Sequence, residues 1–68
     1  MRLCWTDVEE IVEALEEEHH DVDIMSLMFT TLHKLVTELE DFYDDPARSN
    51  EKVLEAIQAE WYELRENS

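Results

Sequence analysis

The chain has 68 residues, enough for one small domain and too few to enclose a large catalytic pocket. Its 19 Asp and Glu outnumber 5 Lys and Arg, so the formal net charge is -14 with the His neutral. A surface this negative repels phosphate backbones and anionic membranes, so neither nucleic acid nor a membrane is an expected partner. Hydrophobic residues make up 44%, sufficient for a core, whereas the absence of Gly and the single Pro disfavour a turn-rich β fold.

The lone cysteine and the hydropathy pattern indicate where the protein works. Cys4 has no cysteine partner for a disulfide, as suits a reducing compartment, and a single thiolate does not hold an iron–sulphur cluster. No apolar run approaches the roughly 20 residues that span a bilayer, and the N-terminus lacks the apolar region of a signal peptide. We expect a single cytoplasmic domain over residues 1–68 that binds or regulates a partner and is not an enzyme.

The first expected helix begins after Trp5 and ends near His19. Thr6 and Glu9 have the spacing of a capping box, with Thr6 as the N-cap. Apolar residues then recur at helical spacing, and acidic residues occupy the opposite face. The apolar residues are Val8, Ile11, Val12 and Leu15, and the acidic ones are Glu9, Glu10, Glu13, Glu16 and Glu17.

A second helix is expected to start at Thr30 or Thr31, after the apolar run 27–29, which suits a strand or an extended segment. Its apolar stripe is expected in the core: Leu32, Leu35, Val36, Leu39, Phe42 and Tyr43. His33 borders this stripe, and we expect it to hydrogen-bond a neighbouring group.

The third helix follows Pro46, because a residue before proline is pushed out of the helical region, and Ser49 is its expected N-cap. Its core face is expected to consist of Val53, Leu54, Ile57, Trp61 and Leu64. Three short helices with a tight second connection resemble a helix-turn-helix or winged-helix plan. Such domains read DNA through a basic helix, and this helix is acidic, so that function is not expected here.

The densest group of chemically active side chains lies between residues 38 and 45. Five carboxylates occur there, and on a helix Glu38, Asp41 and Asp45 would share a face, although we expect Asp45 to lie already outside the helix. Crowded carboxylates repel one another, and a divalent cation such as Mg²⁺, Ca²⁺, Mn²⁺ or Fe²⁺ relieves that repulsion. The candidate metal ligands are therefore Glu38, Glu40, Asp41, Asp44 and Asp45. The plainer interpretation is a solvated acidic surface. A second metal-binding candidate, His19–His20 with Asp21 and Asp23, equally fits two His that complement the end of a helix dipole.

At this point the residues resemble a specific family. The matching segments are Trp5–Thr6–Asp7, Phe29–Thr30–Thr31–Leu32–His33, the run from Leu39 to Pro46, and the run from Ser49 to Ile57 followed by Trp61. Together they resemble the IscX family, small acidic accessory proteins of bacterial iron–sulphur cluster assembly. Thr31 and Tyr43 stand where members of that family often carry acids.

The resemblance implies a mainly α, three-helix modified winged-helix fold, with room for one or two very short strands. It also implies weak Fe²⁺ binding by surface carboxylates and docking of the acidic surface onto a basic patch of the cysteine desulfurase, with a ferredoxin as a further candidate partner. The expected docking residues are Asp7, Glu9, Glu10, Glu13, Glu16, Glu17, Asp41, Asp44 and Asp45. Two alternatives stay open: a free-standing iron carrier, and an acidic mimic of nucleic acid.

Overall fold

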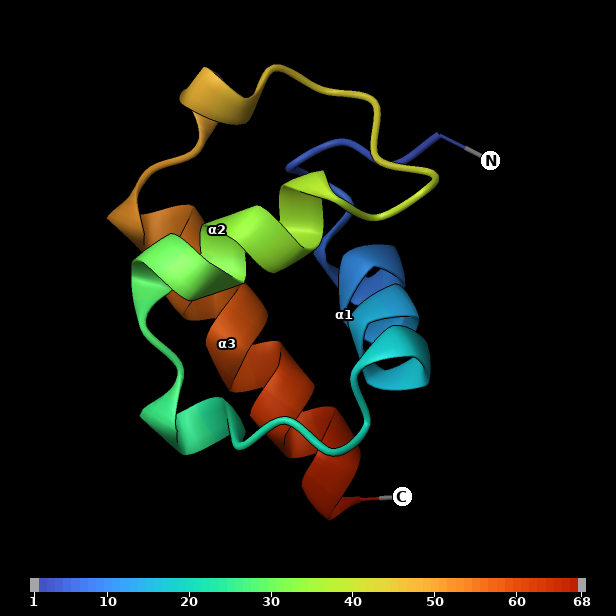
Figure 1. Ribbon diagram of the computed structural model, residues 1–68, viewed down its shortest axis with the longest axis vertical. Coiled ribbons are helices and arrows are strands. Elements are labelled where there is room, and N and C mark those ends of the chain that lie inside the picture. Colours follow the sequence, from blue (N-terminus) through green and yellow to red (C-terminus); the bar gives the residue numbers. More distant parts are fainter. Residues whose placement is uncertain (1, 68) are drawn as a thin grey trace.

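The computed structural model describes residues 2–67, which fold into three α-helices and two short 3₁₀ turns. The helices are α1 (Val8–Glu18), α2 (Phe29–Thr37) and α3 (Glu51–Glu66), and the 3₁₀ turns are η1 (Ile24–Ser26) and η2 (Pro46–Arg48). The longest helix, α3, runs through the middle of the molecule, with α1 on one side and α2 across its first half (Figure 1). The expectation of a mainly α, three-helix fold is confirmed. Within residues 2–67, β pairing is confined to one isolated parallel bridge between Leu3 and Phe42.

The apolar faces of the three helices meet in one hydrophobic core. Trp61 of α3 has no exposed surface and is the largest fully buried side chain of the described residues. Helical spacing correctly predicts the core positions of each helix, because neighbours at three and four residues lie on one face. The core consists of Leu3, Trp5, Ile11, Val12, Leu15, Ile24, Leu32, Val36, Leu39, Leu54, Ile57 and Trp61. No helix within residues 2–67 combines the length and apolarity that crossing a bilayer requires.

The expected capping box at the start of α1 is wrong. The N-cap is Asp7, not Thr6, and it makes no side-chain capping bond. The Asp7 carboxylate instead turns back to accept the backbone N–H of Cys4 at 2.9 Å, while the Asp7 N–H donates to the carbonyl of Cys4 at 2.9 Å. A tight turn over residues 4–7 therefore satisfies these groups and shifts the helix start by one residue. The C-cap at His19 lies where it is expected.

The other two helix starts also differ from their expected N-caps. Helix α2 begins at Phe29, before Thr30, and its N-cap Met28 has no side-chain capping bond. Phe29 packs against the core, and this contact draws its residue into the first turn. Helix α3 is capped by Asn50 instead of Ser49, because the Asn50 side-chain oxygen accepts the N–H of Val53 at 2.9 Å. A capping hydrogen bond therefore marks the start of α3, and none marks the start of α2.

The expectation that Tyr43 lies in the core is wrong as well. Helix α2 ends at Thr37, with Glu38 as its C-cap, so the helical spacing that groups Tyr43 with Leu32 no longer applies beyond that point. Tyr43 is 66% exposed, and the Arg2 guanidinium lies over its ring, 5.1 Å from the centroid. Phe42 is half-buried and packs edge-on against Trp5 at 4.8 Å between ring centroids.

Candidate functional site

The acidic run 38–45 lies on an irregular loop, not on a helical face. The N-terminal segment pairs with this loop: the Leu3 N–H donates to the carbonyl of Asp41 at 2.7 Å, and the Tyr43 N–H donates to the carbonyl of Leu3 at 2.8 Å. The chain turns over residues 38–41, and these two bonds then hold Phe42 alongside Leu3 in the parallel bridge. The expected shared helical face of Glu38 and Asp41 is therefore wrong, because helical geometry ends at Thr37. Asp45 lies outside the helix, as expected.

A metal ion needs several ligands held together. Among residues 2–67, no three His, Cys, Asp or Glu side chains are gathered closely enough to hold a metal. This finding covers the candidate ligands Glu38, Glu40, Asp41, Asp44 and Asp45, and equally the His19–Asp23 loop. Iron binding by these carboxylates stays a prediction. If it occurs, the side chains must first move together.

Asp44 has a structural task that the sequence did not reveal. Its Oδ2 accepts the backbone N–H of Trp5 at 3.1 Å, and its Oδ1 accepts the backbone N–H of Asp45 at 2.7 Å. The Arg48 guanidinium lies 3.6 Å from the same Oδ1. Two hydrogen bonds hold the pKa of the Asp44 carboxyl below its usual range, because both favour the charged form. The bond from the backbone N–H of Trp5 has the larger effect, and that from Asp45 the smaller. Asp44 therefore joins the N-terminal segment to the loop.

Trp5 and His33 complete this junction. The Trp5 indole N–H donates to the carbonyl of Asp45 at 2.9 Å, and its ring stacks on His33 with centroids 5.5 Å apart. His33 Nε2 lies 2.7 Å from the carbonyl oxygen of Pro46, and since a carbonyl only accepts, Nε2 is the donor. The expectation that His33 bonds a neighbouring group is confirmed. Both contacts help to position the loop that carries the acidic residues.

Glu16 is a further predicted docking residue with a structural role. Its Oε1 accepts hydrogen bonds from Arg65 Nη2 at 2.9 Å, from Arg65 Nε at 3.0 Å and from the Trp61 indole N–H at 2.8 Å. The hydrogen bonds from Arg65, which have the larger effect, and from Trp61 keep the pKa of Glu16 below its ordinary value. Arg65 also donates to the carbonyls of His19 and Val22. Much of the Glu16 charge is thus engaged inside the protein.

Four other acids of α1, namely Glu9, Glu13, Glu17 and Glu18, line two hollows on the surface. The first, of about 300 Å³, lies between α1 and α3 and includes Glu9 and Glu13 with Glu60 and Glu63. The second, of about 180 Å³, lies between the end of α1 and the loop after α2. It includes Glu17 and Glu18 with Glu40 and Asp41.

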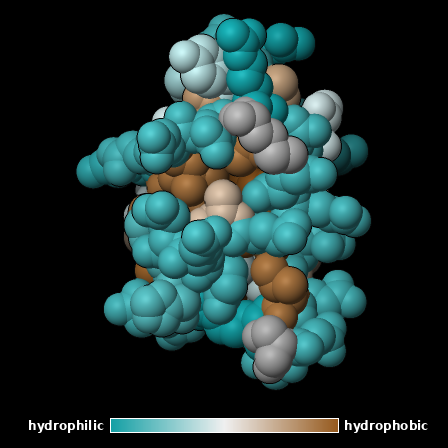
Figure 2. Space-filling view, turned by 90° about the vertical axis from the view of Figure 1, so that its right-hand side faces the viewer, coloured by the Kyte–Doolittle hydropathy of each residue, from teal (hydrophilic) through white to brown (hydrophobic). Residues whose placement is uncertain are grey.

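The two hollows share no lining residue, but Glu9, Glu13 and Glu17 follow one another at intervals of four along α1 and lead from the first hollow to the second. We call the eight carboxylates that line the two hollows the acidic band: Glu9, Glu13, Glu17, Glu18, Glu40, Asp41, Glu60 and Glu63. Within residues 2–67, no Lys or Arg lines either hollow. The side of the molecule on which α1 lies is mostly hydrophilic, with smaller apolar areas in its upper half and at its lower right (Figure 2).

The acidic band agrees with part of the predicted docking set. Of those residues, Glu9, Glu13, Glu17 and Asp41 belong to it. The other five line neither hollow: Asp7, Glu10, Glu16, Asp44 and Asp45. The set predicted from the sequence lacks Glu18, Glu40, Glu60 and Glu63. The acidic, exposed side of the third helix was a signal for the last two, but their place beside α1 depends on how the helices pack.

Comparison with known proteins adds the family. The family described as iron–sulphur cluster assembly matches residues 3–66, nearly the whole chain. The chain belongs to this family. It is also 53% identical, over 66 residues, to an uncharacterized protein of Pseudomonas aeruginosa, and that match covers 97% of this chain and 100% of the relative. The name of this relative states no activity, so the family is the comparison that bears on function. A role in iron–sulphur cluster assembly follows.

Proposed function

We propose that this protein is an IscX-type accessory protein that docks onto a cysteine desulfurase through the acidic band. The observation that carries the proposal is the pair of acidic hollows beside α1: four carboxylates line each of them, and within residues 2–67 no Lys or Arg lines either one. The family supplies the pathway. A catalytic step is not part of the proposal.

Electrostatics explains how such a surface would act. A band of one sign attracts an oppositely charged patch over a distance, so it speeds association more than it strengthens the final complex. Its carboxylates are mostly exposed, and salt therefore screens the attraction within about 10 Å at 0.1 M ionic strength. We expect docking in the cytoplasm that is rapid, reversible and weakened by salt, as suits a regulator that must leave the enzyme again.

Iron binding enters the proposal as a second, weaker property. Exposed carboxylates suit a hard divalent cation such as Fe²⁺, and repulsion within the band would fall on binding. A free-standing carrier would need ligands held together in advance. Asp44 and Asp45 instead each accept backbone N–H groups. We therefore propose docking, and not iron delivery, as the main function. Anaerobic titration with Fe²⁺ in the presence of millimolar Mg²⁺ tests this choice, and a Fe²⁺ affinity unaffected by Mg²⁺ would favour the iron carrier.

The docking test uses charge reversal within the band. The double variant Glu17→Lys/Asp41→Lys is expected to raise the Kd for the desulfurase by about tenfold or more, because both residues are exposed and central to one hollow. Asp44 is unsuitable for this test, since its substitution also removes the bonds to Trp5 and Asp45. Isothermal titration at low and high salt measures the effect.

The matched control reverses two exposed acids outside the band. Asp21→Lys/Glu51→Lys changes the net charge by the same amount, so it lowers any general attraction equally. We expect it to raise the Kd much less than the band variant does. An equal loss in both double variants would show that overall charge, and not this surface, recruits the desulfurase.

A further inference from the structure

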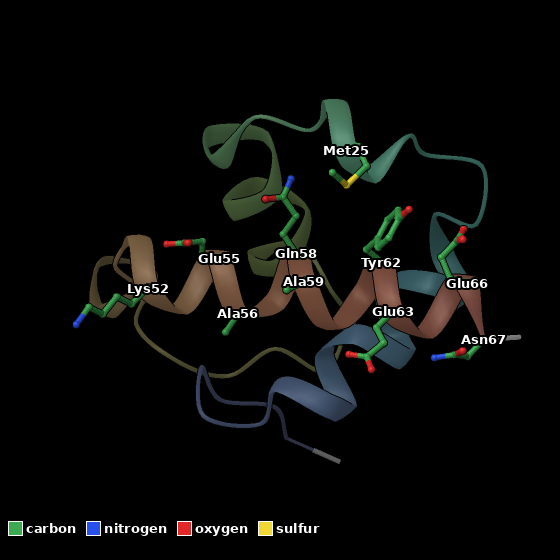
Figure 3. Close-up of a pocket in the computed structure, with 10 residues that line it drawn as sticks. All are labelled: Met25, Lys52, Glu55, Ala56, Gln58, Ala59, Tyr62, Glu63, Glu66 and Asn67. Atoms are coloured by element: carbon green, nitrogen blue, oxygen red, sulfur yellow. The ribbon is translucent and has the colours of Figure 1, made fainter.

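A second surface lies on a different face of α3 from the contacts with α1 and α2. It is a groove of about 930 Å³ that follows the outer face of α3 and is closed on one side by η1. Met25, Ala56, Ala59 and Tyr62 supply its apolar surface. Figure 3 shows Met25 above the helix and Tyr62 pointing from the helix toward it, with Gln58 beside them. Of the residues that line this groove, Glu63 also belongs to the acidic band, and the others do not.

The apolar side chains of this groove are open to solvent. Met25 is 68% exposed and Tyr62 is 41% exposed, the latter on the same helix as the fully buried Trp61. Ala56 and Ala59 are exposed too. A flexible methionine beside small residues and a tyrosine can adapt to an apolar partner, and both residue types are enriched at binding surfaces. Helix faces of this kind bind a second helix through its apolar stripe.

Hydrogen bonds to the backbone on either side of Met25 fix the position of this residue. The Gln58 side-chain amide donates to the carbonyl of Ile24 at 2.9 Å and to that of Leu27 at 3.3 Å. Ile24 itself is buried in the core. Gln58 therefore ties η1 to α3 at the floor of the groove, so the exposure of Met25 is part of the fold.

The charges around the groove indicate what it accepts. Glu55, Glu63 and Glu66 line it together with a single cation, Lys52, near the start of α3. Glu63 also lines the α1–α3 hollow, so the acidic band continues to the edge of the groove. An apolar floor with an acidic border matches a helix that has an apolar stripe flanked by Lys or Arg. It repels an acidic helix, and it repels a second copy of this chain, whose net charge is -14.

We propose that this groove is a docking site for a cationic amphipathic helix of a partner protein. The 16 residues of α3 extend about 24 Å, which suits three to four turns of a bound helix. The site is separate from desulfurase docking through the acidic band, so each proposal can fail while the other stands. The groove would let the protein hold one partner on the band and a second on α3.

A designed peptide tests the proposal on the intact protein. The probe is a synthetic helix of about 18 residues with leucine at every third or fourth position and lysine or arginine elsewhere. Titration into the isotope-labelled protein is expected to shift the amide signals of Ala56, Ala59 and Tyr62 and the methyl signal of Met25. Two further peptides complete the design: one with the same composition and scattered leucines, and one with glutamate in place of the cations. Both are expected to bind more weakly by about tenfold or more.

A pair of variants locates the binding site. Ala59→Lys places a cation on the apolar floor, and lysine favours a helix, so the fold is retained. It is expected to weaken binding of the cationic peptide by about tenfold. Ala47→Lys makes the same change at an exposed alanine outside the groove and is expected to alter the affinity less than about twofold.

Three results would overturn the proposal. One is equal binding of the peptide with scattered leucines, with shifts confined to the acidic band, since that reports attraction without a groove. Another is equal binding of the glutamate peptide, because the acidic border would then decide nothing. The third is a dependence of the groove signals on protein concentration in the absence of peptide, which would make a second copy the occupant.

Discussion

Arg65, in the last turn of α3, donates two hydrogen bonds to a single carboxylate oxygen of Glu16 on α1, 49 positions earlier in the chain. The buried Trp61 indole donates to the same oxygen, and the Arg65 guanidinium lies 5.5 Å from the centre of the Trp61 ring. Arg65 further bonds the carbonyls of His19 and Val22 just after α1. One ion pair thus joins α1, α3 and the start of the loop that follows α1. It uses one of the few cations of this acidic chain.

Removing the charge of Glu16 tests this junction. Glu16→Gln is expected to lower the free energy of unfolding by about 1 kcal/mol, because a charged acceptor of several bonds becomes neutral while partial solvent exposure limits the loss. The control Glu17→Gln removes the same charge from the exposed neighbouring residue and is expected to change stability by less than about 0.5 kcal/mol. Urea unfolding followed by circular dichroism measures both. Equal effects of the two variants would contradict the role assigned to Glu16.

The same pair predicts a pH dependence. The pKa of Glu16 is lowered in the folded protein by Arg65 and Trp61, so its contribution is fully present above the unfolded value of about 4.3 and is lost as pH falls through the folded pKa. Protonation of the many other acids relieves repulsion over the same range and acts in the opposite direction. The difference in unfolding free energy between the natural chain and Glu16→Gln isolates the contribution of the Glu16 charge. It is expected to be constant near neutral pH and to shrink in acid, and a difference that grows in acid would refute the assignment.

Asp44 and Asp45 allow a comparison between adjacent residues. Asp44→Asn leaves one oxygen to serve the N–H groups of both Trp5 and Asp45, so one of them loses its acceptor. Asp45→Asn keeps the oxygen that accepts the N–H of Ala47, as asparagine does well in such turns. The first substitution is expected to lower the melting temperature more than the second and to change the fluorescence of Trp5. Equal melting temperatures would show that the bond to Trp5 does not hold the loop.

Some features follow from local sequence because their physical cause is local. Helical spacing places Ile11 and Leu15 on one face, and likewise Ile57 and Trp61, whatever the rest of the chain does. All four are buried as expected. The net charge of -14 is likewise a property of composition, and from it follows the expectation of a basic partner. The bend before Pro46 is a third local effect.

The exact ends of the helices were harder to predict, because several residues compete for each position. Thr6, Thr30 and Ser49 all have good capping side chains, yet Asp7, Met28 and Asn50 are the N-caps. The apolar spacing of residues 38–45 continues that of α2 and therefore predicts a helical face there. The pairing of this loop with Leu3, 38 and 40 positions away from Asp41 and Tyr43 respectively, prevents this, and such pairing is invisible to a local pattern.

From the sequence alone came the number of helices, the side of each that is buried, and the excess of negative charge, since each depends on near neighbours or on a sum. Only the tertiary structure decided which acids serve the fold and which face solvent together. Glu16 and Asp44 are engaged by Arg65 and Trp5, while Glu13 and Glu63 meet across two helices. The physical reason is that a carboxylate's role depends on the donors that folding brings to it, and those donors lie far away along the chain.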